Sequence, residues 1–168
     1  MKVLLQVYFM VSTPLQLCKQ HTIHSYFYVL TFTYAWIIFC LYYTVLVIDP
    51  TVATENKELK NMPLWFNHTC HTIPPIVTVL EAFICQPKLI SLRRSLCVSY
   101  ALMVTYNIYM EVSIAAFQFS PYPKLDKIDI GYRYVVYIFT WLLVTVFTFI
   151  GHGLVRLVNQ VEITAYIE

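Results

Sequence analysis

Charged residues are scarce in this chain. Of its 168 residues, 12% are charged and 59% are hydrophobic, whereas a soluble globular domain carries about 25% charged residues. This shortage, together with long runs that hold no charge, indicates a protein of the lipid bilayer. The formal net charge is only +2, and no basic patch alternates with aromatic residues, so nothing supports binding to nucleic acid.

No CxxC spacing occurs among the five cysteines, so the sequence offers no disulfide framework. We expect the cysteines to be small buried hydrophobic residues. Cys70 stands between His68 and His71, where a thiol nucleophile or a metal ligand is the less favoured alternative. Two histidines would still need a third metal ligand, and His152 and Glu111 are distant candidates. We therefore expect no metal and no cofactor.

Strand-like alternation of apolar and polar residues, internal repeats and low-complexity tracts are also missing. A membrane barrel needs that alternation, and helices are the other structure that can span a bilayer. We predict an all-α, multi-pass transmembrane helix bundle with four or five spans in one domain over residues 1–168. The candidate spans are residues 3–17, 26–48, 64–85, 95–117 and 134–155.

Residues 26–48 are the strongest of these candidates. They form a run of 23 residues without a formal charge, which at about 1.5 Å per residue can cross a hydrocarbon core of roughly 30 Å. Asp49-Pro50 ends the run, because proline cannot continue a helix and restricts the residue before it. We interpret residues 3–17 as a retained span rather than a cleaved signal, since no small-x-small pattern follows.

Basic residues give the expected orientation of the bundle. Lys88, Arg93 and Arg94 fall within residues 86–94, which hold no acidic residue, and such positively charged loops favour the cytosol. The last span ends at Arg156, which we place on the same side. We expect an integral, multi-pass protein of the plasma membrane or the endomembrane system.

The most unusual segment is NHTCHT, residues 67–72, at the start of an apolar run that ends at Cys85. Polar groups in lipid are expensive and often functional. One interpretation is a membrane-embedded hydrolytic site, and the other is a pair of histidines satisfied by water at the membrane interface. Residues 67–69 also form a glycosylation sequon, whose closeness to the membrane disfavours modification.

Residues 63–72, PLWFNHTCHT, are similar to the pattern W-[LF]-N-H-x-x-H-T of the androgen-induced protein / androgen-dependent TFPI-regulating protein family. These are multi-pass membrane proteins of the type that hydrolyses fatty-acid esters of hydroxy fatty acids. The similarity continues from Pro75 to Glu81, where the family also keeps a carboxylate. Shorter matches are Leu30-Thr31-Phe32, Tyr122-Pro123-Lys124-Leu125 and Leu157-Val158-Asn159. The chain resembles this family over residues 26–36 and 63–160.

The resemblance implies a hydrolase whose nucleophile is Thr31 and whose histidine partner is His71. A threonine hydroxyl needs a nearby base to take its proton, and a neutral imidazole suits that role. We assign supporting roles to His68, one helical turn before His71, and to Glu81. The Asn67 amide is our own candidate for stabilising the oxyanion. The expected partners are membrane lipid and a lipid-ester substrate.

Two other functions are consistent with the same residues. The runner-up is a non-enzymatic multi-pass protein that binds lipid or a partner protein. The third is proton or ion transport through His68, His71, Glu81 and Glu111, which rests only on their expected depth in the membrane. We expect both glutamates to face the bundle interior or to be protonated.

The chain departs from the family between Thr31 and His71, where it is shortened. Members usually have more spans than this chain offers, and residues 26–48 look like the start of one family span joined to the end of the next. From Thr31 to Ile48 a helix rises roughly 25 Å, whereas a hydroxyl and its base must approach to about 3 Å.

Three resolutions of that mismatch are consistent with the sequence. The helix breaks or re-enters the membrane near residues 42–44. Another hydroxyl, such as that of Thr69 or Thr72, replaces Thr31. Or the shortened chain is inactive.

Overall fold

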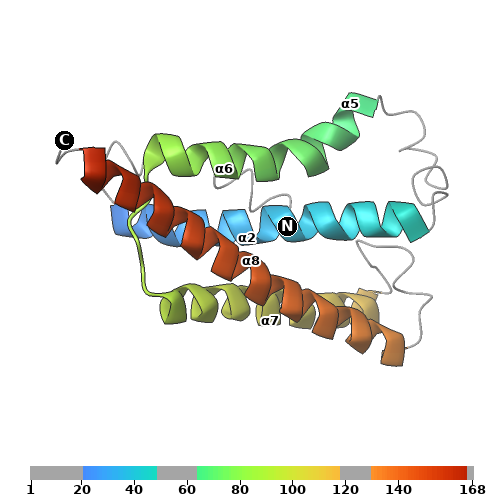
Figure 1. The fold of residues 1–168 in the computed structure, drawn as a ribbon. Coiled ribbons are helices and arrows are strands. Elements are labelled where there is room, and N and C mark those ends of the chain that lie inside the picture. The colour runs from blue at the N-terminus through green and yellow to red at the C-terminus, as the bar shows by residue number, and fades with distance from the viewer. Residues whose placement is uncertain (1–20, 49–63, 118–129, 166–168) are drawn as a thin grey trace.

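The fold is built from helices alone in residues 21–48, 64–117 and 130–165, the part of the chain that the computed structural model describes (Figure 1). In chain order the elements are α2 (His21–Ile48), α5 (Leu64–Asn67), the π-helical turn η1 (His68–Thr72), α6 (Ile73–Cys85), α7 (Leu92–Phe117) and α8 (Ile130–Ala165). The prediction of an all-α protein is confirmed. The candidate span 3–17 and the family match at residues 122–125 lie outside the described residues.

Two of these helices contain stretches long and apolar enough to cross a membrane, Thr22–Ile48 and Ile130–Gln160. They include the predicted spans 26–48 and 134–155. Both helices begin before the predicted starts, because backbone hydrogen bonding continues through the polar residues that precede the charge-free runs. The other candidate spans in the described part are largely helical, and their crossing of a membrane stays a prediction.

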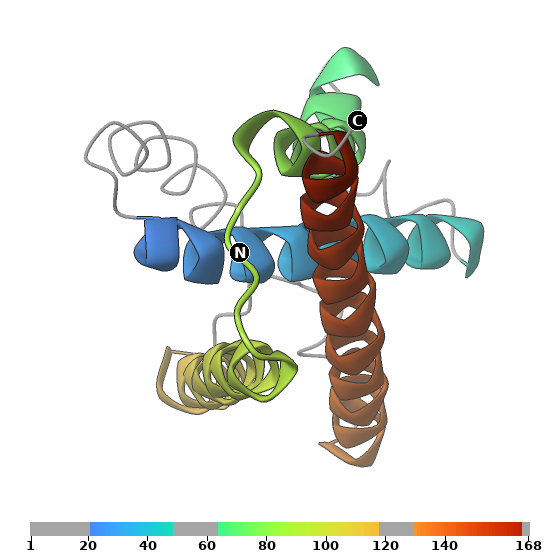
Figure 2. The same cartoon turned by 60° about the vertical axis from the view of Figure 1, so that its left-hand side comes forward.

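α2 lies at the centre of the bundle. It contacts α6, α7 and α8, with α6 and α7 on opposite sides and α8 crossing it (Figures 1 and 2). A helix that is apolar on every side is suited to such a buried place. Two apolar clusters surround it: Tyr28, Val29, Phe32, Ala82, Val155 and Val158 in the first, and Tyr34, Ile37, Met103 and Val144 in the second.

Buried hydroxyl groups join three of the helices. Thr33 Oγ1 on α2 lies 3.3 Å from Thr148 Oγ1 on α8, which donates to Ser99 Oγ on α7 at 3.2 Å. Tyr34 OH donates to the backbone oxygen of Ser99 at 2.7 Å. Polar side chains between helices must find partners inside the bundle when lipid surrounds it. This chain of hydroxyls therefore fixes how α2, α7 and α8 meet.

Gly151 of α8 lies close to the side chain of Phe32 on α2. A Cβ atom placed on Gly151 would lie 2.7 Å from Cδ1 of Phe32, which is buried in the first apolar cluster. The same construction at the exposed Gly153 meets nothing within 4 Å. The crossing of α2 and α8 thus depends on Gly151 having no side chain, and it does not depend on Gly153.

We predict that Gly151→Ala lowers the thermal stability of the purified protein in detergent, while Gly153→Ala does not. Alanine adds about 1 kcal/mol of helix propensity at either site, but crowding a packed ring costs about 1–3 kcal/mol. Melting temperatures followed by size-exclusion chromatography check this. A Gly151→Ala variant as stable as Gly153→Ala would show that the close approach to Phe32 is unimportant.

Candidate functional site

The last five residues of NHTCHT, His68–Thr72, form a π-helical turn between two α-helices. η1 joins α5 to α6 without a break, so the motif occupies the first turns of one helical segment, as predicted. Pro74 and Pro75 stand at the start of α6. Because neither proline has an N–H group, neither can donate an α-helical hydrogen bond to the preceding turn. A π-turn placed just before them therefore loses fewer backbone hydrogen bonds than it would elsewhere in a helix. π-turns are rare and concentrate at functional sites.

This turn packs against the C-terminal half of α2 through two adjacent tyrosines. The ring of His71 stacks on the ring of Tyr42 with centroids 3.8 Å apart and planes 5° from parallel. The hydroxyl of Tyr43 lies 2.7 Å from Thr72 Oγ1 and 3.4 Å from His68 Nδ1. The motif is therefore held by one ring stack and a group of hydrogen bonds.

His68 and Thr72 also contact each other. The distance from His68 Nδ1 to Thr72 Oγ1 is 3.1 Å, so an imidazole, a threonine hydroxyl and the Tyr43 phenol lie within hydrogen-bonding reach of one another. A hydroxyl beside an unprotonated imidazole nitrogen is the arrangement from which nucleophilic catalysis starts. We call His68, Thr72 and Tyr43 the hydroxyl–imidazole cluster.

The cluster opens to the outside of the bundle. His68 is exposed, while Thr72 and Tyr43 are half-buried. Trp65, one turn before Thr69, is 64% exposed, and its backbone oxygen accepts the Thr69 hydroxyl at 2.9 Å. The alternative hydroxyl of Thr69 is thus bonded to its own helix rather than to an imidazole.

Thr31 lies elsewhere on α2. It is fully buried, and among the described residues its Oγ1 has no hydrogen-bond partner. Tyr42, against which His71 stacks, comes eleven positions after Thr31, so the two sites are about 17 Å apart along the helix axis. α2 runs without interruption to Ile48. A break near residues 42–44, one of the three resolutions considered, is wrong, because every residue there continues the helix. The structure therefore does not bring Thr31 to His71.

Glu81 also lies apart from the motif. It is 8% exposed, and its Oε1 lies 3.4 Å from Nε2 of the buried His24 on α2. Tyr28, one turn after His24, donates its hydroxyl to the Thr78 backbone oxygen at 3.2 Å. The expectation that Glu81 faces the bundle interior is confirmed. Sequence reasoning missed His24, although its helical spacing from Tyr28 was a signal.

The remaining polar candidates are dispersed. Glu111 accepts from Tyr137 at 2.8 Å and lies 3.5 Å from Arg133, between α7 and α8. His152 donates from Nε2 to the backbone oxygen of Ile90 at 3.1 Å. Glu111 thus links α7 to α8, and His152 links α8 to the loop between α6 and α7.

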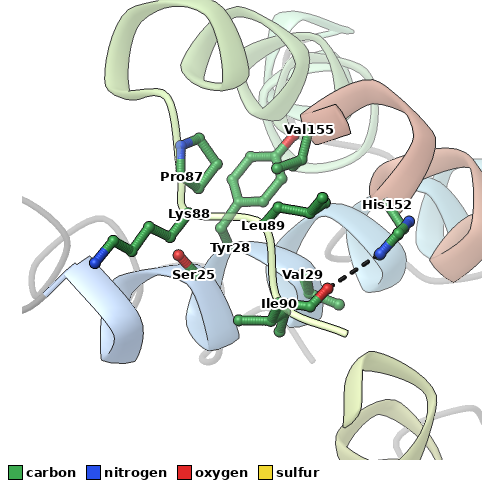
Figure 3. A pocket seen from close by; sticks show the side chains of 9 residues that line it. All are labelled: Ser25, Tyr28, Val29, Pro87, Lys88, Leu89, Ile90, His152 and Val155. Carbon is green, nitrogen blue, oxygen red and sulfur yellow. Dashed lines mark hydrogen bonds between the residues drawn. The ribbon is translucent and has the colours of Figure 1, made fainter. Parts of the chain in front are cut away.

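A small pocket lies beside the His152 contact, at the loop between α6 and α7 (Figure 3). Ser25, Tyr28 and Val29 of α2 line it together with residues 87–90 and with His152 and Val155 of α8. Its volume of about 10 Å³ suits one water molecule and is far below that of an acyl chain. Asn159 Nδ2 also donates to the Pro87 backbone oxygen at 3.2 Å, so this region serves to fasten the loop to α8.

Two further predicted features concern metals and the oxyanion. No group of three or more His, Cys, Asp or Glu side chains in the described residues is placed to hold a metal ion. Asn67 is the last residue of α5, and its side chain lies outside the part that the structure describes, so its suggested role stays a prediction.

Comparison with models of protein families shows which family the chain belongs to. The model described as FAR-17a/AIG1-like protein matches residues 2–156. The chain belongs to the FAR-17a/AIG1-like family. This match confirms the resemblance to the androgen-induced proteins, and together with the two apolar helices it indicates a membrane protein. No curated protein and no solved structure matches this FAR-17a/AIG1-like chain.

We predict that the Tyr43 hydroxyl stabilises the contact of η1 with α2. Tyr43→Phe keeps the ring and removes the hydroxyl bonded to Thr72, which should cost about 1 kcal/mol of local stability and speed amide exchange in residues 68–72 about fivefold. Tyr42→Phe keeps the ring that stacks on His71 and serves as the control. Hydrogen exchange read by mass spectrometry checks both variants, and equal exchange in the two would contradict the proposed anchoring.

Proposed function

We propose that this protein is a multi-pass, membrane-embedded hydrolase of fatty-acid esters of hydroxy fatty acids that uses a threonine hydroxyl and a histidine imidazole. The observation that carries the proposal is the 3.1 Å contact between His68 Nδ1 and Thr72 Oγ1, inside the segment that most resembles the family pattern. A base within reach of a hydroxyl is the minimum that covalent ester hydrolysis needs. Membership of the FAR-17a/AIG1-like family supports the membrane setting.

The surface beside the cluster fits a lipid substrate. α6 continues directly from the motif and exposes a series of large apolar side chains: Ile73, Ile76, Leu80, Phe83 and Ile84. In a bilayer this face contacts acyl chains, since burying apolar area there is favourable. A branched ester lying along α6 would present its carbonyl near the motif while its chains stay in the hydrocarbon.

The water that hydrolysis consumes can reach the proposed site from the membrane surface. His68 is exposed and lies at the end of the α5–α6 segment opposite the basic loop 86–94 that we assign to the cytosol. The proposed site therefore faces the other side of the membrane, at the level where the aqueous interface meets the acyl chains. Ester carbonyls of membrane lipids occupy this level as well.

Thr31 and His71 are the residues that the resemblance proposes for catalysis. Their separation of about 17 Å along an unbroken α2 exceeds the hydrogen-bonding reach that a dyad requires. This separation favours the second candidate function, a non-enzymatic membrane protein that binds lipid or a partner protein. The two functions differ in turnover and are separated by a single assay.

The proposal predicts turnover of a branched fatty-acid ester by the purified protein in lipid nanodiscs. Product release is measured by mass spectrometry against nanodiscs without the protein, and labelling by a lipase-type fluorophosphonate probe is measured in parallel. Turnover together with labelling supports the hydrolase. If the protein is folded, as judged by its melting transition, and shows neither turnover nor labelling, the result supports the non-enzymatic function instead.

Thr31→Ala and His71→Ala are tested in the same assay. If the family dyad assembles, each variant loses about 100-fold or more of the turnover, as expected for loss of a nucleophile or base. If α2 keeps the two residues apart during turnover, the Thr31→Ala variant retains the wild-type rate.

A further inference from the structure

We infer that Thr72 is the nucleophile of the proposed hydrolase, that His68 is its general base, and that Tyr43 is a positioning residue that holds the Thr72 hydroxyl. This inference rests on the proposed function and names the residues that perform it. It differs from the assignment that the family resemblance implies, which uses Thr31 and His71.

The Thr72 hydroxyl is bonded in an unusual way for a helix threonine. Helix threonines commonly donate to the carbonyl oxygen one turn earlier, and Thr69, Thr105 and Thr145 do so at 2.9–3.0 Å. The hydroxyl of Thr72 instead lies 2.7 Å from Tyr43 OH and 3.1 Å from His68 Nδ1. It is thus directed away from its own backbone and toward an imidazole.

One arrangement of hydrogens satisfies every member of the hydroxyl–imidazole cluster. In the tautomer of His68 that carries its proton on Nε2, Nδ1 is an acceptor. Thr72 then donates to Nδ1, and Tyr43 donates to Thr72 Oγ1. The threonine proton is aimed at the base, and one lone pair of Oγ1 is left for attack. The contact between Tyr43 and His68, at 3.4 Å, is the longest of the three distances, and no hydrogen lies between these two residues in this arrangement.

Thr72 is more accessible to a substrate than Thr31. Thr31 is fully buried in the centre of the bundle, so a substrate carbonyl reaches it only if the surrounding helices move. Thr72 is half-buried, and the neighbouring His68 and Ile73 are exposed. An ester in the surrounding lipid therefore meets the Thr72 hydroxyl without a change of fold, and water meets His68 from the adjacent interface.

The first chemical step transfers the acyl group to Thr72. Oγ1 bonds to the ester carbonyl carbon while its proton passes to His68 Nδ1, and the carbonyl electron pair moves onto oxygen. When the carbonyl re-forms, the bond to the hydroxy fatty acid breaks. The leaving oxygen takes the proton from His68, which releases the hydroxy fatty acid and leaves an ester on Thr72.

The second step returns the site to its starting state. A water molecule attacks the acyl carbon while one of its protons passes to His68 Nδ1. The bond between that carbon and Thr72 Oγ1 then breaks, and Oγ1 recovers a proton from His68. The products are the free fatty acid and the regenerated pair, so one water is consumed for each ester cleaved.

The alternative is that these hydrogen bonds only dock η1 against α2. Turnover in lipid nanodiscs separates the two explanations through Thr72→Val, which keeps the shape, and Thr72→Ser, which keeps the hydroxyl. We expect Thr72→Val and His68→Ala to lose about 100-fold or more of the turnover and Thr72→Ser to retain most of it. Thr105→Val is the control, since Thr105 is exposed on α7 and its hydroxyl donates to the Ala101 backbone oxygen of its own helix.

Covalent mapping on the wild-type protein decides the case even if a variant fails to fold. The protein is treated with a fluorophosphonate probe, digested, and sequenced by mass spectrometry, and we expect the adduct on Thr72. An adduct on Thr31 or Cys70, or unchanged turnover in Thr72→Val, overturns the inference while the hydrolase proposal stands. Absence of both turnover and adduct in the wild type removes the hydrolase proposal, and this assignment with it.

Discussion

An unbroken α2 is the constraint on which the rest of this molecule depends. Its backbone hydrogen bonds run from His21 to Ile48, and in lipid a break would leave polar groups that nothing can satisfy. The rise of about 1.5 Å per residue therefore fixes the distances between side chains along α2. This spacing places Thr31 in the buried centre of the bundle and Tyr42 and Tyr43 beside the motif.

The antiparallel packing of α6 on α2 extends the same constraint to the histidines. His24 meets Glu81 near one end, and Tyr42 and Tyr43 meet His71 and Thr72 near the other. Contacts at both ends leave little freedom to slide one helix along the other by three turns. A threonine–histidine site in this chain is for that reason most consistent with a threonine of the motif itself.

Parts of this arrangement were readable from the sequence. The charge-free run 26–48 correctly predicted the central helix, and the candidate span 64–85 correctly placed NHTCHT near the start of a helical segment, because local apolar composition determines both. The contacts of Tyr43 were not predictable, since they depend on which face of α2 meets η1. The π-turn was not predicted for a related reason. The polar contacts that hold its residues His68 and Thr72 come from Tyr43, which lies on another helix.

The central claim is that His71 sits beside Tyr42 and not beside Thr31. Cysteine pairs at positions 42 and 71 and at positions 31 and 71, in a chain whose native cysteines are replaced by serine, test it with a short bifunctional thiol reagent in lipid nanodiscs. The account predicts efficient cross-linking of the first pair and none of the second. Cross-linking of the second pair, with none of the first, would contradict the account and restore the Thr31–His71 dyad.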